Sequence, residues 1–141
     1  MNAIDTNVFV YFFDDDEPAK QAKATELLGR LVTPPSQTLL MWQVAGELLS
    51  CLRRWQSLGK VSDDDVRAHV ADVLNMFPMA MPTRNVIPRS LDLTSRHSLS
   101  HWDSMLVAAC IESHVDILYT EDMDNGATYD SVTIVDPFKG T

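Results

Sequence analysis

The chain has 141 residues, 45% of them hydrophobic and 22% charged, with a formal net charge of −9. This composition excludes a disordered chain and favours one globular domain over residues 1–141. No apolar run approaches the roughly 20 residues of a membrane-spanning helix, and the first residues lack the features of a secretory signal. We therefore expect a cytoplasmic protein with no membrane association, and the acidic balance argues against binding nucleic acid by phosphate neutralisation alone.

Short apolar runs alternate with longer segments in which apolar residues recur every 3.6 residues, the pattern of strands alternating with helices. In chain order, the expected elements are a strand at 3–4, helices at 7–13 and 19–32, a strand at 38–42, helices at 43–59 and 66–77, a strand at 79–83, helices at 84–97 and 101–114, and strands at 116–120 and 132–135. Such alternation implies crossover connections and a parallel sheet covered on both faces. The sequence therefore predicts an α/β fold, a three-layer α/β/α sandwich with a central parallel sheet.

Several residues mark the ends of these elements. Asn7 can cap the first helix, and Pro18 stands at the start of the second, just before the 19–32 segment, where proline is tolerated. Ser62 and Asp65 have the spacing of a capping box before the 66–77 segment. Either Ser98 or Ser100 can cap the helix at 101–114, and an irregular loop is expected between the last two strands.

The two cysteines fall on apolar helix faces. Cys51 and Cys110 are expected to be buried free thiols of a reducing compartment, because no CxxC pair is present. The four histidines lack HxxxH or HxxE spacing, so a zinc site is not expected.

Acidic residues follow two of the expected strands directly. Asp5 comes after the first strand and Asp122 after the run ILYT, so both would lie at one edge of a parallel sheet, where ligands bind. Asp5 could also be only a helix cap, and Asp122 lies in an acidic loop beside Glu121 and Asp124, any of which could supply this carboxylate.

Two further acids occur where apolar residues are expected. Glu47 lies among Val44, Leu48 and Cys51. Asp103 falls in the first turn of its helix, on the face that carries the apolar residues of that helix. A buried carboxylate is costly unless it is paired or binds a cation. Four acids from four elements therefore indicate a site for Mg²⁺ or Mn²⁺, ions that can activate water for phosphodiester cleavage.

An ordered set of motifs resembles the PIN domain family, and more narrowly the VapC-type toxins of bacterial toxin–antitoxin pairs. These motifs are AIDTNVFVY, QVAGELLSCLRR, LSHWDSMLVAAC and ILYTEDMDNG followed by VDPF. The resemblance implies a Mg²⁺- or Mn²⁺-dependent endoribonuclease, usually dimeric and inhibited by a cognate antitoxin. Its four acidic positions match Asp5, Glu47, Asp103 and Asp122 as catalytic and metal-binding residues.

Other residues would assist these four. Thr6 and Asn7 would support Asp5 by hydrogen bonds, and Thr120 would do the same near Asp122. A basic antitoxin tail could insert Arg or Lys side chains among the carboxylates. The chain departs from the family in the closing motif, where Asp136 stands in place of an asparagine.

RNA contact is a weaker expectation from the sequence. Arg53, Arg54 and Trp55 could bind phosphate and stack on a base, although such residues at a helix end can equally form a solvated face. The alternative function is a catalytically silent PIN-like module that binds RNA or protein.

Overall fold

The alternating pattern produces one six-stranded sheet in the computed structural model, which describes residues 1–139. Its strands are β1 (Asn2–Ile4), β2 (Thr38–Met41), β3 (Met79–Ala80), β4 (Ile117–Tyr119), β5 (Thr128–Tyr129) and β6 (Val132–Val135). Their order is β3-β2-β1-β4-β6-β5; all neighbours pair in parallel except β5 and β6, which are antiparallel. The last two residues of the expected domain 1–141 lie outside the described residues.

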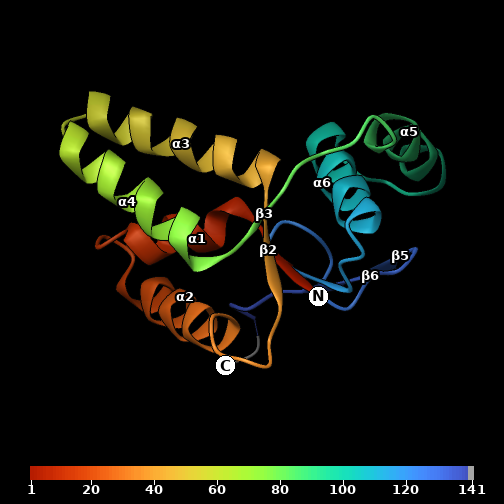
Figure 1. The fold of residues 1–141 in the computed structure, drawn as a ribbon, viewed down its shortest axis with the longest axis horizontal. Coiled ribbons are helices and arrows are strands. Elements are labelled where there is room, and N and C mark those ends of the chain that lie inside the picture. The colour runs from red at the N-terminus through yellow and green to blue at the C-terminus, as the bar shows by residue number, and fades with distance from the viewer. Residues whose placement is uncertain (140–141) are drawn as a thin grey trace.

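Helices cover both faces of this sheet. They are α1 (Thr6–Phe13), α2 (Pro18–Leu31), α3 (Trp42–Ser57), α4 (Asp63–Met76), α5 (Val86–Arg96) and α6 (His101–Glu112). Helices α1 to α4 lie on one side of the strands, and α5 and α6 lie on the other (Figure 1). The expected α/β/α sandwich is thus confirmed, with one correction: the sheet is mixed, because the short strand β5, expected to be part of a loop, pairs antiparallel at its edge.

The capping expectations are partly confirmed. Ser62 and Asp65 form the expected capping box of α4, and Ser100, not Ser98, caps α6. Asn7 does not cap the first helix: α1 begins one residue earlier, at Thr6, and its cap is Asp5, whose carboxylate accepts the Thr6 N–H at 2.7 Å. The extended backbone at the end of β1 places Asp5 in the conformation that a helix cap requires.

The hydrophobic core forms where the central strands pack against the apolar faces of the helices. Ala3, Leu118 and Ile134, from three adjacent strands, are fully buried, as expected for strands covered on both faces. Cys51 and Cys110 are buried and free, as predicted. Within residues 1–139, no helix is both long and apolar enough to cross a membrane.

The order of the strands reverses beside β1. The chain leaves β1 toward β2 and β3 through the helices of one face, and then returns through α5 and α6 to β4 on the other side of β1. At such a switch point the connections diverge from the carboxyl ends of two neighbouring strands and leave a crevice between them. Asp5 follows β1 and Thr120 follows β4, so the topology places both residues at this crevice.

Candidate functional site

Asp5 is the buried member of the predicted acidic set. Only 5% of its surface is exposed, and its two oxygens accept separate hydrogen bonds, from the Thr6 N–H and the Thr120 hydroxyl, each at 2.7 Å. Burial raises the pKa of Asp5 from 3.8 to about 6; these two hydrogen bonds oppose the rise, and the charges of Asp122 and Glu47 add to it. Asp5 is both a helix cap and part of an acidic cluster, two roles that the sequence presents as alternatives.

Thr120 connects Asp5 to Asp122. Its hydroxyl donates to Asp5 and accepts the Asp122 backbone N–H at 3.1 Å. The Asp122 carboxylate accepts the Asn7 amide at 3.1 and 3.4 Å, whereas the sequence predicted that Asn7 would support Asp5. Asp122 is exposed, but neighbouring atoms remove part of its hydration, and this desolvation, together with the charges of Glu121 and Asp103, raises its pKa above its usual range.

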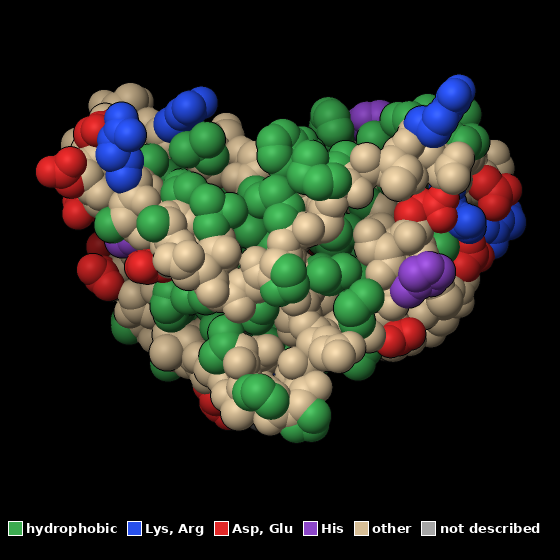
Figure 2. Space-filling model, viewed as in Figure 1, with side chains coloured by type: hydrophobic (Ala, Val, Ile, Leu, Met, Phe, Trp, Pro, Cys, Tyr) green, Lys and Arg blue, Asp and Glu red, His purple; other side chains and the backbone are tan. Residues whose placement is uncertain are grey.

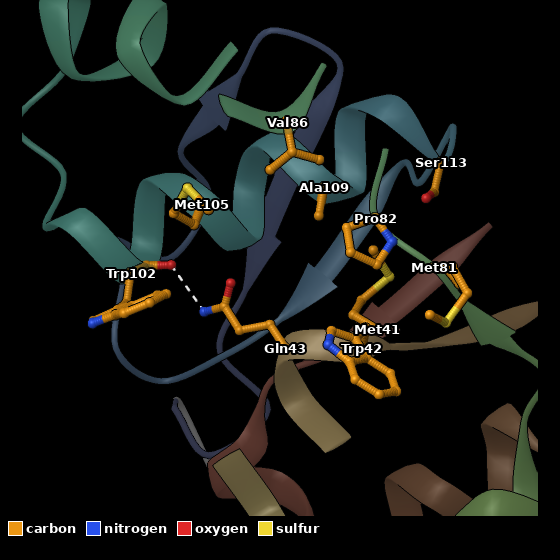
Figure 3. A pocket seen from close by; sticks show the side chains of 11 residues that line it. Met41, Trp42, Gln43, Met81, Pro82, Val86, Trp102, Met105, Ala109 and Ser113 are labelled. Carbon is orange, nitrogen blue, oxygen red and sulfur yellow. Dashed lines mark hydrogen bonds between the residues drawn. The ribbon is translucent and has the colours of Figure 1, made fainter. Parts of the chain in front are cut away.

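Glu47 reaches the cluster from α3. Its carboxylate accepts the Thr6 hydroxyl at 2.9 Å and the Gln43 amide at 2.9 Å, and Gln43 also donates to the Trp102 carbonyl at 3.1 Å (Figure 3). The expectation that Glu47 lies on the buried stripe of its helix is wrong, because its side chain is exposed. It stands at the edge of that stripe, from which its carboxylate extends to Thr6 at the start of α1.

Asp103 approaches from the other face of the sheet. It lies in the first turn of α6, and its N–H donates to the capping hydroxyl of Ser100 at 3.2 Å. Its side chain is half-buried rather than buried, so Asp5 is the one fully buried member of the four. The charge of Asp103 acts on Asp122, and the charges of Asp122 and Glu47 act on Asp5, so the four acids lie near enough to influence one another at the carboxyl ends of β1 and β4.

The donor chemistry of this crevice suits a hard divalent cation. All four side chains are carboxylates, and within residues 1–139 no lysine or arginine forms an ion pair with any of them. As the side chains stand, no three His, Cys, Asp or Glu residues of that range form a group that could hold a metal ion. The residues therefore fit such an ion by chemical type and charge, but they do not form a closed ligand cage.

The three acids of the loop after β4 differ in their surroundings. Glu121 accepts the Tyr11 hydroxyl at 2.6 Å and pairs with Lys20 at 2.9 Å. Asp124 is exposed, and its charge acts on Tyr129. Asp122 alone of the three is hydrogen-bonded to both Asn7 and Thr120, which makes it the loop acid that the structure ties to Asp5.

Three residues that form hydrogen bonds with the acids were not identified from the sequence: Gln43, Tyr11 and Lys20. Gln43 could have been noticed, because it lies four residues before Glu47 and therefore on the same helix face. No local pattern connects Tyr11 or Lys20 to a residue more than 100 positions away.

Asp136 accepts the Phe138 N–H at 2.8 Å and so caps the turn of the closing motif.

The three residues expected to contact RNA do not share one environment. Arg53 and Arg54 are exposed on α3, and Arg53 lines a groove between α3 and α4. Trp55 is 9% exposed and belongs to the core, with the Lys60 ammonium 4.5 Å from the centre of its ring. A base therefore has no open Trp55 ring on which to stack, and this part of the expectation is corrected.

Comparisons with known proteins agree with the fold. Residues 3–129 match the PIN domain family. No curated protein sequence matches the chain. The solved structure of a toxin–antitoxin complex from Klebsiella pneumoniae is similar to it, with a TM-score of 0.68 and 18% identity over 97% of this chain and 98% of the other.

Two further solved structures share the fold. VapC20 of Mycobacterium tuberculosis, described as a sarcin–ricin loop cleaving toxin, has a TM-score of 0.63 and 18% identity, over 88% of this chain and 92% of its own. VapBC2 of Rickettsia felis, bound to a promoter DNA fragment, has a TM-score of 0.68 and 12% identity, over 94% and 96%. At these identities the structures support the fold, and the match over residues 3–129 identifies the family: the chain belongs to the PIN domain family.

Proposed function

We propose that this chain is a Mg²⁺- or Mn²⁺-dependent endoribonuclease of the VapC type, which hydrolyses RNA phosphodiester bonds as the toxin of a toxin–antitoxin pair. The observation that carries the proposal is the environment of Asp5. This carboxylate is buried beside two other acids that raise its pKa, and no cation among residues 1–139 compensates it. A binding site for a divalent cation and an anionic substrate accounts for this arrangement.

Each residue of the crevice has a role in this proposal. Asp5 and Asp103 would ligate the metal, directly or through water, and Glu47 and Asp122 would complete its surroundings. A bound divalent ion would lower the pKa of a water molecule and neutralise charge on the scissile phosphate. The hydrogen bonds from Thr6, Asn7 and Thr120 hold three of the carboxylates in place before any ligand binds. This pre-organisation reduces the cost of ordering the site during the reaction.

Incubation with structured RNAs, with Mn²⁺ and with EDTA, tests this function. The wild-type chain should cleave at least one RNA of a broad panel, EDTA should abolish cleavage, and Asp103→Ala should be inactive while it remains folded. Equal behaviour of the wild type and Asp103→Ala across the panel would refute an enzyme. Folded but inactive protein that still bound RNA or another protein would support the alternative of a catalytically silent PIN-like module.

A basic antitoxin is the protein partner that the charge distribution favours. The net charge is −9, and the crevice concentrates carboxylates without ion pairs from lysine or arginine in the described part of the chain. Arg or Lys side chains of an antitoxin tail would neutralise the crevice and exclude both metal and RNA. The resemblance to the Klebsiella and Rickettsia complexes is consistent with such a partner. We place this activity in the cytoplasm, where its RNA substrates are found.

A second copy of the chain would cover an apolar hollow between β2, α3 and α6. Hydrophobic side chains gather across the middle of one face of the molecule, between the α3–α4 side and the α5–α6 side (Figure 2). Trp42, Met81 and Trp102 line a pocket of about 240 Å³ there, and they are 53%, 61% and 61% exposed (Figure 3). Large exposed apolar residues gathered in one hollow are typical of a protein–protein interface. We therefore propose that the chain forms a homodimer through this hollow.

RNA binding would also use charged side chains outside the crevice. Arg53 and Arg54 are exposed on the helix that carries Glu47, and they can neutralise phosphates of an RNA that extends from the crevice. Trp55 is not part of this proposal, because it lies in the core.

A further inference from the structure

One face of α1 contacts two consecutive residues of the loop after β4. Asn7 donates to the Asp122 carboxylate at 3.1 and 3.4 Å, and Tyr11 donates its hydroxyl to Glu121 Oε1 at 2.6 Å. Asn7 and Tyr11 are four residues apart, so they share a helix face. Asp5 caps the N-terminus of the same helix. Helix α1 thus fixes the position of Asp122 relative to Asp5, because it contacts Asp5 through its N-cap and Asp122 through this face.

Lys20 of α2 completes the contact at Glu121. Its ammonium donates to Glu121 Oε2 at 2.9 Å and to the Tyr11 hydroxyl at 3.1 Å, and it lies 4.6 Å from the centre of the Tyr11 ring. The Phe138 ring packs against Tyr11 with centres 5.1 Å apart, and Lys20 lies 5.5 Å from it. Glu121 is therefore fixed by both of its oxygens to two helices, and its side chain is only 18% exposed.

The protonation states of this group strengthen the contact at neutral pH. Burial, together with the hydrogen bond to Glu121, raises the pKa of Tyr11, so its hydroxyl remains a donor. The hydrogen bonds to Glu121 and Tyr11 raise the pKa of Lys20, so it remains charged. A charged donor and a neutral donor thus bind one carboxylate, a combination stronger than a bond between two neutral groups.

We infer that Glu121 is a positioning residue, which Tyr11 and Lys20 hold so that the adjacent Asp122 stays at the crevice beside Asp5. This inference rests on the proposed function, since it assigns the three residues to the support of the same metal site. Glu121 itself is not a metal ligand in this arrangement, because its carboxylate is neutralised by the Lys20 ammonium, whereas none of the four acids of the crevice pairs with a lysine or arginine of the described residues. Residues that orient a metal ligand from outside the coordination shell typically change metal affinity or activity by about 10–100-fold when they are replaced.

Tyr11→Phe and Lys20→Met test the inference in the full chain with Mn²⁺ alone as the probe. Tyr11→Phe keeps the ring and the net charge and removes only the hydroxyl donor. We expect each variant to bind Mn²⁺ about tenfold more weakly by electron paramagnetic resonance. Lys20→Arg, which can still pair with Glu121, should retain most of the wild-type affinity for Mn²⁺. In metal-free buffer, the Asp122 N–H, which donates to Thr120, should exchange with solvent faster in both weakened variants.

Lys60→Met is the matched control. Lys60 also pairs with acids, Asp14 and Asp16, and lies over an aromatic ring, that of Trp55, but none of these residues belongs to the crevice. It should leave Mn²⁺ affinity and Asp122 exchange at the wild-type values. Unchanged Asp122 exchange in Tyr11→Phe and Lys20→Met would overturn the inference, as would an equal loss of affinity in Lys60→Met.

Failure of the proposed function has a different signature. A wild-type chain that binds no Mn²⁺ and cleaves no RNA would refute the metal-dependent nuclease, and with it the support of a metal site by Glu121. Faster Asp122 exchange in the two variants would then still show that Tyr11 and Lys20 hold the loop. Wild-type binding and cleavage with unchanged variants would instead refute the inference and leave the proposed function standing.

Discussion

Thr120 donates its hydroxyl proton to Asp5 over 2.7 Å, and the two residues are 115 positions apart in the sequence. The bond joins the carboxyl ends of β1 and β4, the two strands at which the order of the sheet reverses. The same oxygen accepts the Asp122 N–H, so one hydroxyl links the buried acid to the loop acid. This contact therefore holds Asp5 next to the loop that carries Asp122.

Thr120→Val should therefore destabilise the protein. The substitution preserves the shape of the side chain but leaves one buried Asp5 oxygen without its donor. A hydrogen bond to a charged group contributes about 1.5–3 kcal/mol, so the free energy of unfolding at neutral pH should fall by about that amount. Because this bond also lowers the pKa of Asp5, that pKa should rise above about 6 in the variant. Urea unfolding and NMR titration of Asp5 measure the two effects, and Thr120→Ser, which retains the donor, is the control.

The raised pKa of Asp5 should make the metal-free protein less stable as the pH rises through the acid range. Between 3.8 and about 6 the folded state holds a proton that the unfolded state has released, so stability falls across this window and then levels off. The cost at pH 7 is on the order of 3 kcal/mol. Asp5→Asn removes the titration and remains a good helix cap. In EDTA, the free energy of unfolding of Asp5→Asn minus that of the wild type should thus increase from pH 4 to 6.5. If the two free energies changed with pH in parallel, the titration of Asp5 would not be the origin of the instability.

Mn²⁺ should stabilise the wild type through the same acids. At a concentration 100 times its dissociation constant, an ion that binds only the folded state adds about 2.7 kcal/mol to the free energy of unfolding. Asp103→Asn and Asp5→Asn should each abolish the increase in melting temperature. Asp92→Asn removes an acid that pairs with Arg96 outside the crevice, and it should keep the full increase. Loss of the increase in all three variants would indicate a general effect of charge.

The buried hydroxyl pair between α5 and α6 should show strong coupling. Ser90 Oγ and Ser104 Oγ lie 2.7 Å apart, and Ser104 also donates to the His101 carbonyl. Ser104→Ala leaves the Ser90 hydroxyl buried without its partner, at a cost of about 1–3 kcal/mol. The double variant removes both polar groups and should cost less than the sum of the two single changes. Additive losses in denaturant titrations would argue against a shared hydrogen bond.

A charge in the apolar hollow should dissociate the proposed dimer. Met81 is 61% exposed and lines the hollow, whose lining includes none of the four acids, so Met81→Lys would bury a charge only when two copies associate. Analytical ultracentrifugation should detect a dimer of the wild type and a monomer of the variant. Leu58→Lys places the same charge on a residue that is 76% exposed at the end of α3, outside the hollow, and it should remain dimeric. A wild-type monomer at high concentration would refute the dimer.

The sequence by itself determined the alternation of strands and helices and the acids at the ends of β1 and β4. Local patterns are sufficient for these features, because hydrophobic periodicity and capping residues act over a few positions. The capping box of Ser62 and Asp65 and the helix of Pro18 follow from such patterns. The first helix is less clear from the sequence, which offers both Asn7 and Asp5 as its cap; the structure uses Asp5, because the end of β1 gives it an extended backbone.

Only the tertiary structure decided how the acids are buried and held. Glu47 is exposed and reaches Thr6, Asp103 is half-buried, and Trp55 is in the core, all because of packing between distant elements. The different surroundings of Asp122 and Glu121 result from contacts to α1 and α2, more than 100 positions away. Periodicity assigns a residue to a face of its own helix, but burial and hydrogen bonding depend on the element that packs against that face.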